Sequence, residues 1–175
     1  MKKALLRWEL VGFVFVISLG SLLHFVYDWS DRSSFVACFA PVNESTWEHL
    51  KLLFFPSLLY GIVEYIAVGH KIEGFVFTKF VSILLGLGTI VVLFYTYTGI
   101  VGGNCLWADI GTFVVGAALS SAFTVKKMPI NSDGRVDWIG LLLFAIMIFA
   151  FCLGTFFPPH IGLFLDPVTL TYGIS

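Results

Sequence analysis

The chain has 175 residues, of which 58% are hydrophobic and 12% charged, and its mean hydropathy is +0.95. A soluble domain carries about 25% charged residues, so this chain has too little polar surface to cover a water-facing globule. Its formal net charge is −1, and it has no basic stripe, zinc-knuckle spacing or glycine-rich phosphate loop. These features exclude the nucleic-acid-binding and nucleotide-binding classes.

Five apolar stretches are long enough to cross a hydrocarbon core of about 30 Å, which takes about 20 helical residues. In chain order they cover residues 5–29, 45–69, 74–97, 105–125 and 136–157. Turn-forming residues separate them. The sequence therefore predicts an all-α integral membrane bundle, a single domain of five transmembrane helices in a lipid bilayer.

The positions of lysine and arginine predict the orientation of the chain. With the N-terminus in the cytoplasm, the inner segments hold eight of the ten basic residues, against Arg32 and Lys51 in the outer segments. Basic residues concentrate on the cytoplasmic side of membrane proteins, so we expect the N-terminus to be cytoplasmic and the C-terminus to lie outside. The tryptophans agree, because Trp8 and Trp138 then fall at the inner interface and three others at the outer one: Trp29, Trp47 and Trp107.

Two apolar segments are too short or too irregular to span. Residues 35–42 are expected to form a loop folded onto the bundle or a shallow re-entrant piece, and the tail 158–175 to fold back over the outer mouth. The first span is expected to stay uncleaved, because its hydrophobicity continues past the small-residue site at residues 18–20 as far as Trp29.

Polar residues recur near the predicted outer face. His24 and Asp28 lie one helical turn apart, the spacing at which a carboxylate orients an imidazole or both hold one cation. At the start of the second span, Ser45 and Glu48 match a capping box, in which the two side chains satisfy unpaired amides of the first turn. The cap leaves the neighbouring Glu44 and His49 without a structural role.

This outer face carries the candidate metal ligands His24, His49, His160, Asp28 and Asp109. Histidines with carboxylates form the ligand set of zinc or another divalent metal, although no spacing here matches a known metal motif. Glu44 and Glu48 are the candidate catalytic bases. The alternative is that these polar groups only hydrogen-bond the outer loops together.

Two further pairs are expected. Glu64, well inside the second span, should pair with Lys79 of the third, because a lone charge in lipid is costly. Cys38 and Cys105 both fall on the outer side, where a disulfide between them is a candidate. The third and fourth spans should pack closely through small residues at four-residue spacing: Ser82, Gly86, Gly116 and Ser120.

Three segments carry a family resemblance: residues 23–29 (LHFVYDW), residues 41–51 (PVNESTWEHLK), and the tail motif PPHI at 158–161 with Asp166-Pro167. They resemble an uncharacterised family of small bacterial multi-pass membrane proteins, a domain of unknown function. The resemblance covers the whole chain and implies a prokaryotic plasma membrane. It carries over no catalytic residue.

Three functional classes stay open at this point. The first is a membrane-embedded hydrolase or transferase that uses an outer metal on a lipid-borne or other small substrate. The second is a small-solute or proton-coupled permease, or a packing subunit of a membrane complex, for which Glu64 should matter. In the third, the outer polar cluster is purely structural.

Overall fold

The computed structural model describes residues 2–128 and 135–174. Most of this chain is helical, and the long helices are α1 (Lys2–Trp29), α3 (Thr46–Ala67), α4 (Phe75–Val101), α5 (Leu106–Lys127) and α6 (Arg135–Phe156). A single-turn helix, α2 (Ser34–Ala37), and a 3₁₀ turn, η1 (Gly69–Lys71), lie between them. All five long helices are long and apolar enough to cross a membrane. The predicted all-α class and the five candidate spans are thus confirmed.

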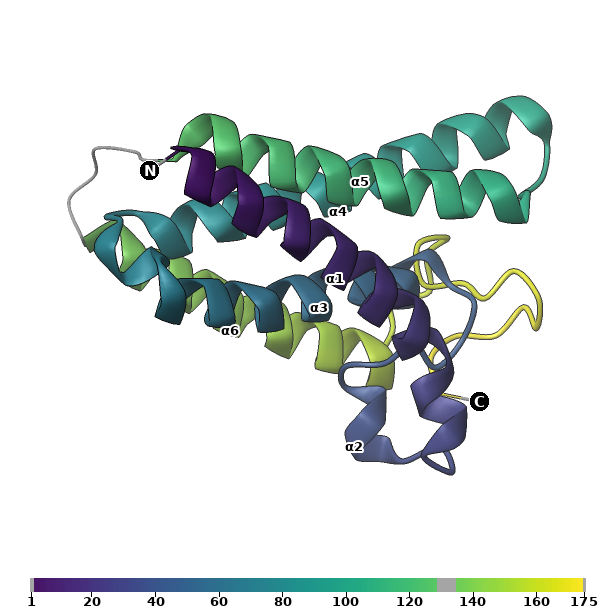
Figure 1. Ribbon diagram of the computed structural model, residues 1–175. Helices are drawn as coiled ribbons and strands as arrows, with labels where there is room; N and C mark the ends of the chain where they lie inside the picture. The colour runs from purple at the N-terminus through teal and green to yellow at the C-terminus, as the bar shows by residue number, and fades with distance from the viewer. Residues whose placement is uncertain (1, 129–134, 175) are drawn as a thin grey trace.

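The five long helices form one bundle in which each crosses from end to end (Figure 1). Helix α4 packs against α5 and α6, and α1 packs against α3 and α5. The two termini lie at opposite ends of the bundle. We call the end that holds the last residue of α1, the first turn of α3 and residues 157–174 the tail end.

The outer surface of the bundle is apolar. In the most hydrophobic window of each long helix, only 22% to 44% of the residues are buried inside the protein. Leucine, isoleucine and phenylalanine side chains cover the rest, as at Leu142 and Phe149 of α6. Soluble proteins rarely expose so large a continuous apolar surface to water, so the helices are suited to a lipid bilayer.

The core is built from aromatic and aliphatic side chains of all five long helices. Leu53, Phe54 and Phe151 are fully buried, and the rings of Phe54 and Phe151 lie 5.1 Å apart. Helices α4 and α5 approach closely at glycines: a Cβ added to Gly86 would lie 2.8 Å from the carbonyl oxygen of Gly116. The small residues expected between these helices therefore bring the two backbones into contact.

Two helix starts are fixed by side chains. Ser45 caps α3, and its hydroxyl accepts a hydrogen bond from the amide of Glu48 at 3.4 Å. The Glu48 carboxylate does not complete the capping box, because it accepts instead from the amide of Val42. At the start of α4, the carboxylate of Asp137 accepts from the amides of Gly74, Val76 and Phe77 at 3.0, 2.7 and 3.2 Å. That cap comes from α6, far along the chain.

The tail packs onto the first turn of α3. The Trp47 amide donates to the carbonyl of Leu163 at 2.9 Å, and the Trp47 ring stacks on Phe164 with centroids 4.7 Å apart. The side chain of Asn43 donates to the carbonyl of Gly173 at 2.9 Å. These contacts hold the loop before α3 between the tail and the bundle, and that loop carries Glu44.

Candidate functional site

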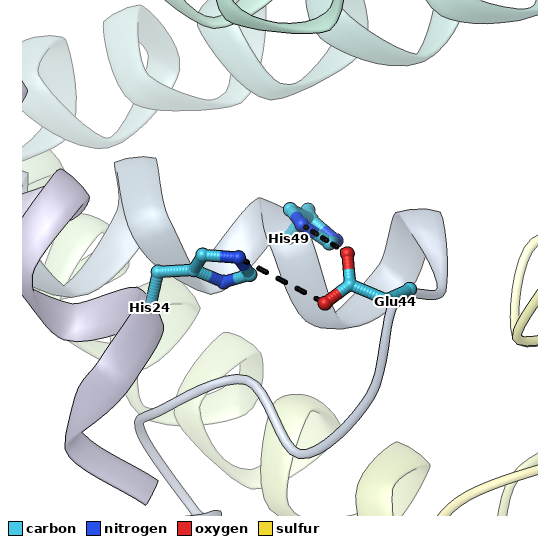
Figure 2. A group of neighbouring side chains, drawn as sticks. All are labelled: His24, Glu44 and His49. Carbon is cyan, nitrogen blue, oxygen red and sulfur yellow. Dashed lines mark ion pairs between the residues drawn. The ribbon is translucent and has the colours of Figure 1, made fainter. Parts of the chain in front are cut away.

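Three ligand-type side chains meet at the tail end: His24 from the last turns of α1, Glu44 from the loop before α3, and His49 from the first turn of α3. The Glu44 carboxylate faces both imidazoles, with Oε1 3.8 Å from His24 Nε2 and Oε2 3.4 Å from His49 Nε2 (Figure 2). One ligand atom from each residue lies within 4.8 Å of the other two. Segments separated by up to 25 positions in sequence thus supply two nitrogens and one carboxylate to one point.

The backbone fixes the orientation of one imidazole. His49 Nδ1 lies 3.0 Å from the carbonyl oxygen of Ser45. A carbonyl oxygen can only accept, so Nδ1 carries the proton and the neutral ring keeps a lone pair on Nε2. Metal-bound histidines are typically held in this way, with the second ring nitrogen donating to a backbone carbonyl.

The other imidazole has no such partner. Nδ1 of His24 is buried and has no hydrogen-bond partner in the described chain. Its Nε2 is 3.8 Å from Glu44, beyond ordinary hydrogen-bonding distance. Buried polar groups are normally satisfied, and the two rings lie only 5.2 Å apart. Hydrogen bonding within the protein therefore does not account for the position of His24.

The cluster is open to the surface and borders an aromatic patch. The side chains of His24 and His49 are each 33% exposed and that of Glu44 is 48% exposed. Phe25 lies beside the His24 ring and stacks on Trp29, and both aromatic residues are exposed. Exposed aromatic rings of this kind are typical of the boundary between lipid and water.

The structure does not bring the remaining candidate ligands to this cluster. Asp28 points to Arg32, at 3.7 Å, and its side chain is 75% exposed. Asp109 accepts hydrogen bonds from Tyr97 and Asn104 at the turn between α4 and α5. His160 stacks on Tyr172 within the tail, with centroids 4.5 Å apart. Each of these three side chains contacts a residue that lies nearby in the sequence or in the same segment.

Glu48, the second candidate base, belongs to a separate buried network. Lys51 is fully buried and donates to Glu48 Oε2 at 2.6 Å, to Thr155 Oγ1 at 2.6 Å and to the carbonyl of Ala37 at 2.7 Å. Thr155 in turn donates to Glu48 Oε1 at 2.7 Å. The network ties α3 to α6 and to the end of α2, and it occupies both oxygens of Glu48.

A third charged group lies inside the bundle. Lys79 pairs with Glu64 at 2.7 Å, as the sequence predicts, and also with Glu9 of α1. Sequence reasoning missed Glu9, which stands close to three basic residues near the N-terminus. Its signal was a carboxylate within an otherwise apolar helical stretch.

All three cysteines, each in the described part of the chain, are free thiols. The candidate disulfide between Cys38 and Cys105 is therefore not formed. Cys38 lies instead beside Cys152, whose thiol is 3.9 Å from the Cys38 carbonyl oxygen, and Cys105 is exposed at the start of α5.

In the tail, Asp166 has a structural role. Its carboxylate accepts from the amides of Val168 and Thr169 and from the Thr169 hydroxyl, at 2.8, 3.4 and 2.9 Å. Burial raises the pKa of Asp166, but these hydrogen bonds outweigh burial and hold the pKa below its usual value. Asp166 is thus an ionised turn former rather than a ligand.

Comparison with known proteins gives a family and no functional relative. No curated protein and no solved structure matches the chain. One family model matches nearly its whole length, residues 1–174, and is described as a family of unknown function, DUF6512. The chain, a helical membrane protein with two histidines and a glutamate gathered at one end, belongs to this family of unknown function.

Proposed function

We propose that the protein binds one zinc ion, or a similar divalent transition metal, through His24, Glu44 and His49, and uses it for hydrolysis at the membrane surface. The observation that carries the proposal is the convergence of two imidazole nitrogens and one carboxylate oxygen within 4.8 Å. Two histidines and one glutamate are a ligand set of catalytic zinc sites, which keep a fourth position open for water.

The distances suit such a site. Ligands about 2.0–2.2 Å from a tetrahedral zinc lie roughly 3.3–3.6 Å from one another. The His49–Glu44 separation of 3.4 Å already has this value, and the His24–Glu44 separation is 3.8 Å. The side chains of Glu44 and His24 are 48% and 33% exposed, which leaves room for the rotation that would close the site. The proton on His49 Nδ1 supplies the outer hydrogen bond that orients a metal-bound ring.

The metal would supply the chemistry that the protein side chains lack. Zinc held by His24, Glu44 and His49 would make a bound water acidic near neutral pH, which is the chemistry that hydrolysis of an ester or phosphoester needs. With Glu44 acting as a ligand and Glu48 bound to Lys51, no separate general base is invoked.

The position of the site supports the proposal of a lipid-borne substrate. The cluster lies at one end of the bundle beside the exposed pair Phe25 and Trp29. We further propose that this end is the non-cytoplasmic face of a plasma membrane. Lys71, Lys126 and Lys127 lie near the opposite end, which fits the preference of basic residues for the cytoplasmic side.

The test is the zinc content of the purified protein after loading with zinc and removal of excess metal. The unmodified chain should retain one zinc, and so should His160→Ala, because His160 lies in the tail against Tyr172. Removal of a residue that only orients a ligand lowers metal affinity by about 10- to 100-fold. Loss of a ligand itself should lower zinc affinity by more than this in each of three variants: His24→Ala, His49→Ala and Glu44→Gln. An unmodified chain without zinc, or alanine variants that keep it, would refute the proposal.

The permease or packing-subunit class has less support. A carboxylate that moves solutes or protons should face a water-filled route. Glu64 is fully buried and paired with Lys79. Its effect on transport would have to be indirect, so the metal site is the better-supported centre of function.

A further inference from the structure

A second site lies inside the bundle, where three helices each contribute one charge. Glu9 of α1, Glu64 of α3 and Lys79 of α4 form a linked pair of ion pairs through the Lys79 ammonium group. The side chains of Glu9, Glu64 and Lys79 are 4%, 0% and 10% exposed. All three charges are therefore removed from water within segments that are otherwise apolar.

The charges of this cluster do not balance. Two ionised carboxylates and one ammonium sum to −1, and an uncompensated charge in a medium of low dielectric is strongly disfavoured. The charged groups that act on Glu9 in the described chain are Lys79 and Glu64 alone. The other packed groups are neutral: Tyr60 of α3, which donates to the carbonyl of Trp8 at 2.6 Å, and the hydroxyl residue Ser121 of α5.

A bound proton restores neutrality. Two carboxylates that share a site with one cation can hold one proton between them, as like-charged pairs do in a confined space. The buried pair of Glu48 and Lys51 differs, because it has one charge of each sign and needs no proton. The excess carboxylate distinguishes the Lys79 cluster from an ordinary structural ion pair.

A small polar cavity gives water access to the cluster. It has a volume of about 20 Å³, and the polar half of its lining comes from Glu9, Lys79 and five hydroxyl residues: Ser57, Tyr60, Ser82, Ser120 and Ser121. A cavity of this volume and polarity holds a single water. Glu9 and Ser121 also line a mostly apolar crevice of about 430 Å³ between α1 and α5, which has Lys126 among its lining residues. Glu9 thus lies between the internal cavity and this crevice.

From this geometry we propose that Glu9, Glu64 and Lys79 form a proton-binding site in which the two carboxylates hold one exchangeable proton, taken up and released at Glu9. Glu64 does not line the cavity and is fully buried. Glu64 keeps Lys79 in place while Glu9 exchanges. The site is independent of the metal cluster, which lies at the tail end.

Infrared spectroscopy of the purified protein in lipid tests this proposal directly. The unmodified chain should show the carbonyl band of one protonated carboxyl group at neutral pH, and the band should shift when the water is replaced by deuterium oxide. In Glu9→Gln and in Glu64→Gln the remaining carboxylate pairs with Lys79 without excess charge, so both variants should fold and lack the band. Glu73→Gln, which removes an exposed carboxylate outside the long helices, should keep it.

Three results would overturn the proposal. The first is an unmodified chain with no protonated carboxyl band. The second is a band that survives in both Glu9→Gln and Glu64→Gln, because the proton would then lie elsewhere. The third is a band that deuterium oxide leaves unshifted, because the proton would then not exchange with water. Zinc content should stay at one per chain in both glutamine variants, so failure of this site and failure of the metal site are distinguishable.

Discussion

Removal of the buried lysine of α3 should strongly destabilise the protein. In Lys51→Met a side chain of similar length fills the space, but Glu48, which is 2% exposed, loses its cation. Removing one partner of a buried ion pair lowers the free energy of unfolding by about 3–5 kcal/mol, because the remaining charge is uncompensated. Lys51 also donates to the Ala37 carbonyl and to Thr155, so α2 and α6 lose a shared anchor. We therefore expect a loss in the upper half of that range.

The double variant Lys51→Met with Glu48→Gln separates charge from packing. It removes both charges and leaves an amide whose oxygen can still accept from Val42 while its NH2 group donates to Thr155, so it should recover about 1–4 kcal/mol relative to Lys51→Met alone. The assay is equilibrium unfolding in mixed micelles, followed by circular dichroism. Lys71→Met, at an exposed position in η1, serves as the control and should leave stability nearly unchanged. A single variant within about 1 kcal/mol of the unmodified chain, or a double variant no more stable than the single, would refute this reasoning.

Three further predictions concern helix contacts and the tail. Gly86→Ala should lower unfolding free energy by about 1–3 kcal/mol in the same assay, because the new methyl meets the Gly116 carbonyl at 2.8 Å, whereas Gly88→Ala, with open space around it, should not. Asp137→Ala should cost about 1–2 kcal/mol by uncapping α4, which faster amide hydrogen exchange at the start of that helix would reveal. Because the pKa of Asp166 is lowered in the folded state, its contribution to the stability of the tail should be complete above the ordinary aspartate pKa and lost as the pH falls through the lowered value. Protease cleavage of the tail should therefore increase as the pH falls through that value, and Asp166→Asn should abolish this pH dependence.

The helices could be predicted from the sequence because hydrophobic length alone determines them. Each predicted span overlaps one long helix, and the ends differ by a few residues, as at α4, which continues to Val101. The single turn of α2 could not be predicted in the same way. Four residues have no helical periodicity, and the turn is held by burial of Ala37 and by the ammonium of Lys51.

The candidate site was only partly predictable. His24, His49 and Glu44 could be grouped because helix ends at one face bring distant residues together. Asp28 and Asp109 share that face, but each binds a nearby partner, Arg32 for Asp28 and Tyr97 for Asp109. The sequence does not show whether a carboxylate will bind such a partner or join the cluster.

Buried charges were the least predictable feature. The position of Lys51 near the start of the second span predicts a basic residue at the outer face, yet Lys51 is fully buried in α3. Its spacing of three residues from Glu48 was the available signal, since such a pair lies on one helix face. Glu9 gave a weaker signal, because its partner Lys79 is 70 positions away.

The most direct test of the account is the X-ray absorption spectrum of the zinc-loaded protein in lipid. The account predicts two imidazole nitrogens at about 2.0–2.1 Å together with oxygen ligands at about 2.0–2.2 Å. A shell of sulfur from the free cysteines, or a shell of oxygens without imidazole, would contradict the assignment of the metal to His24, Glu44 and His49.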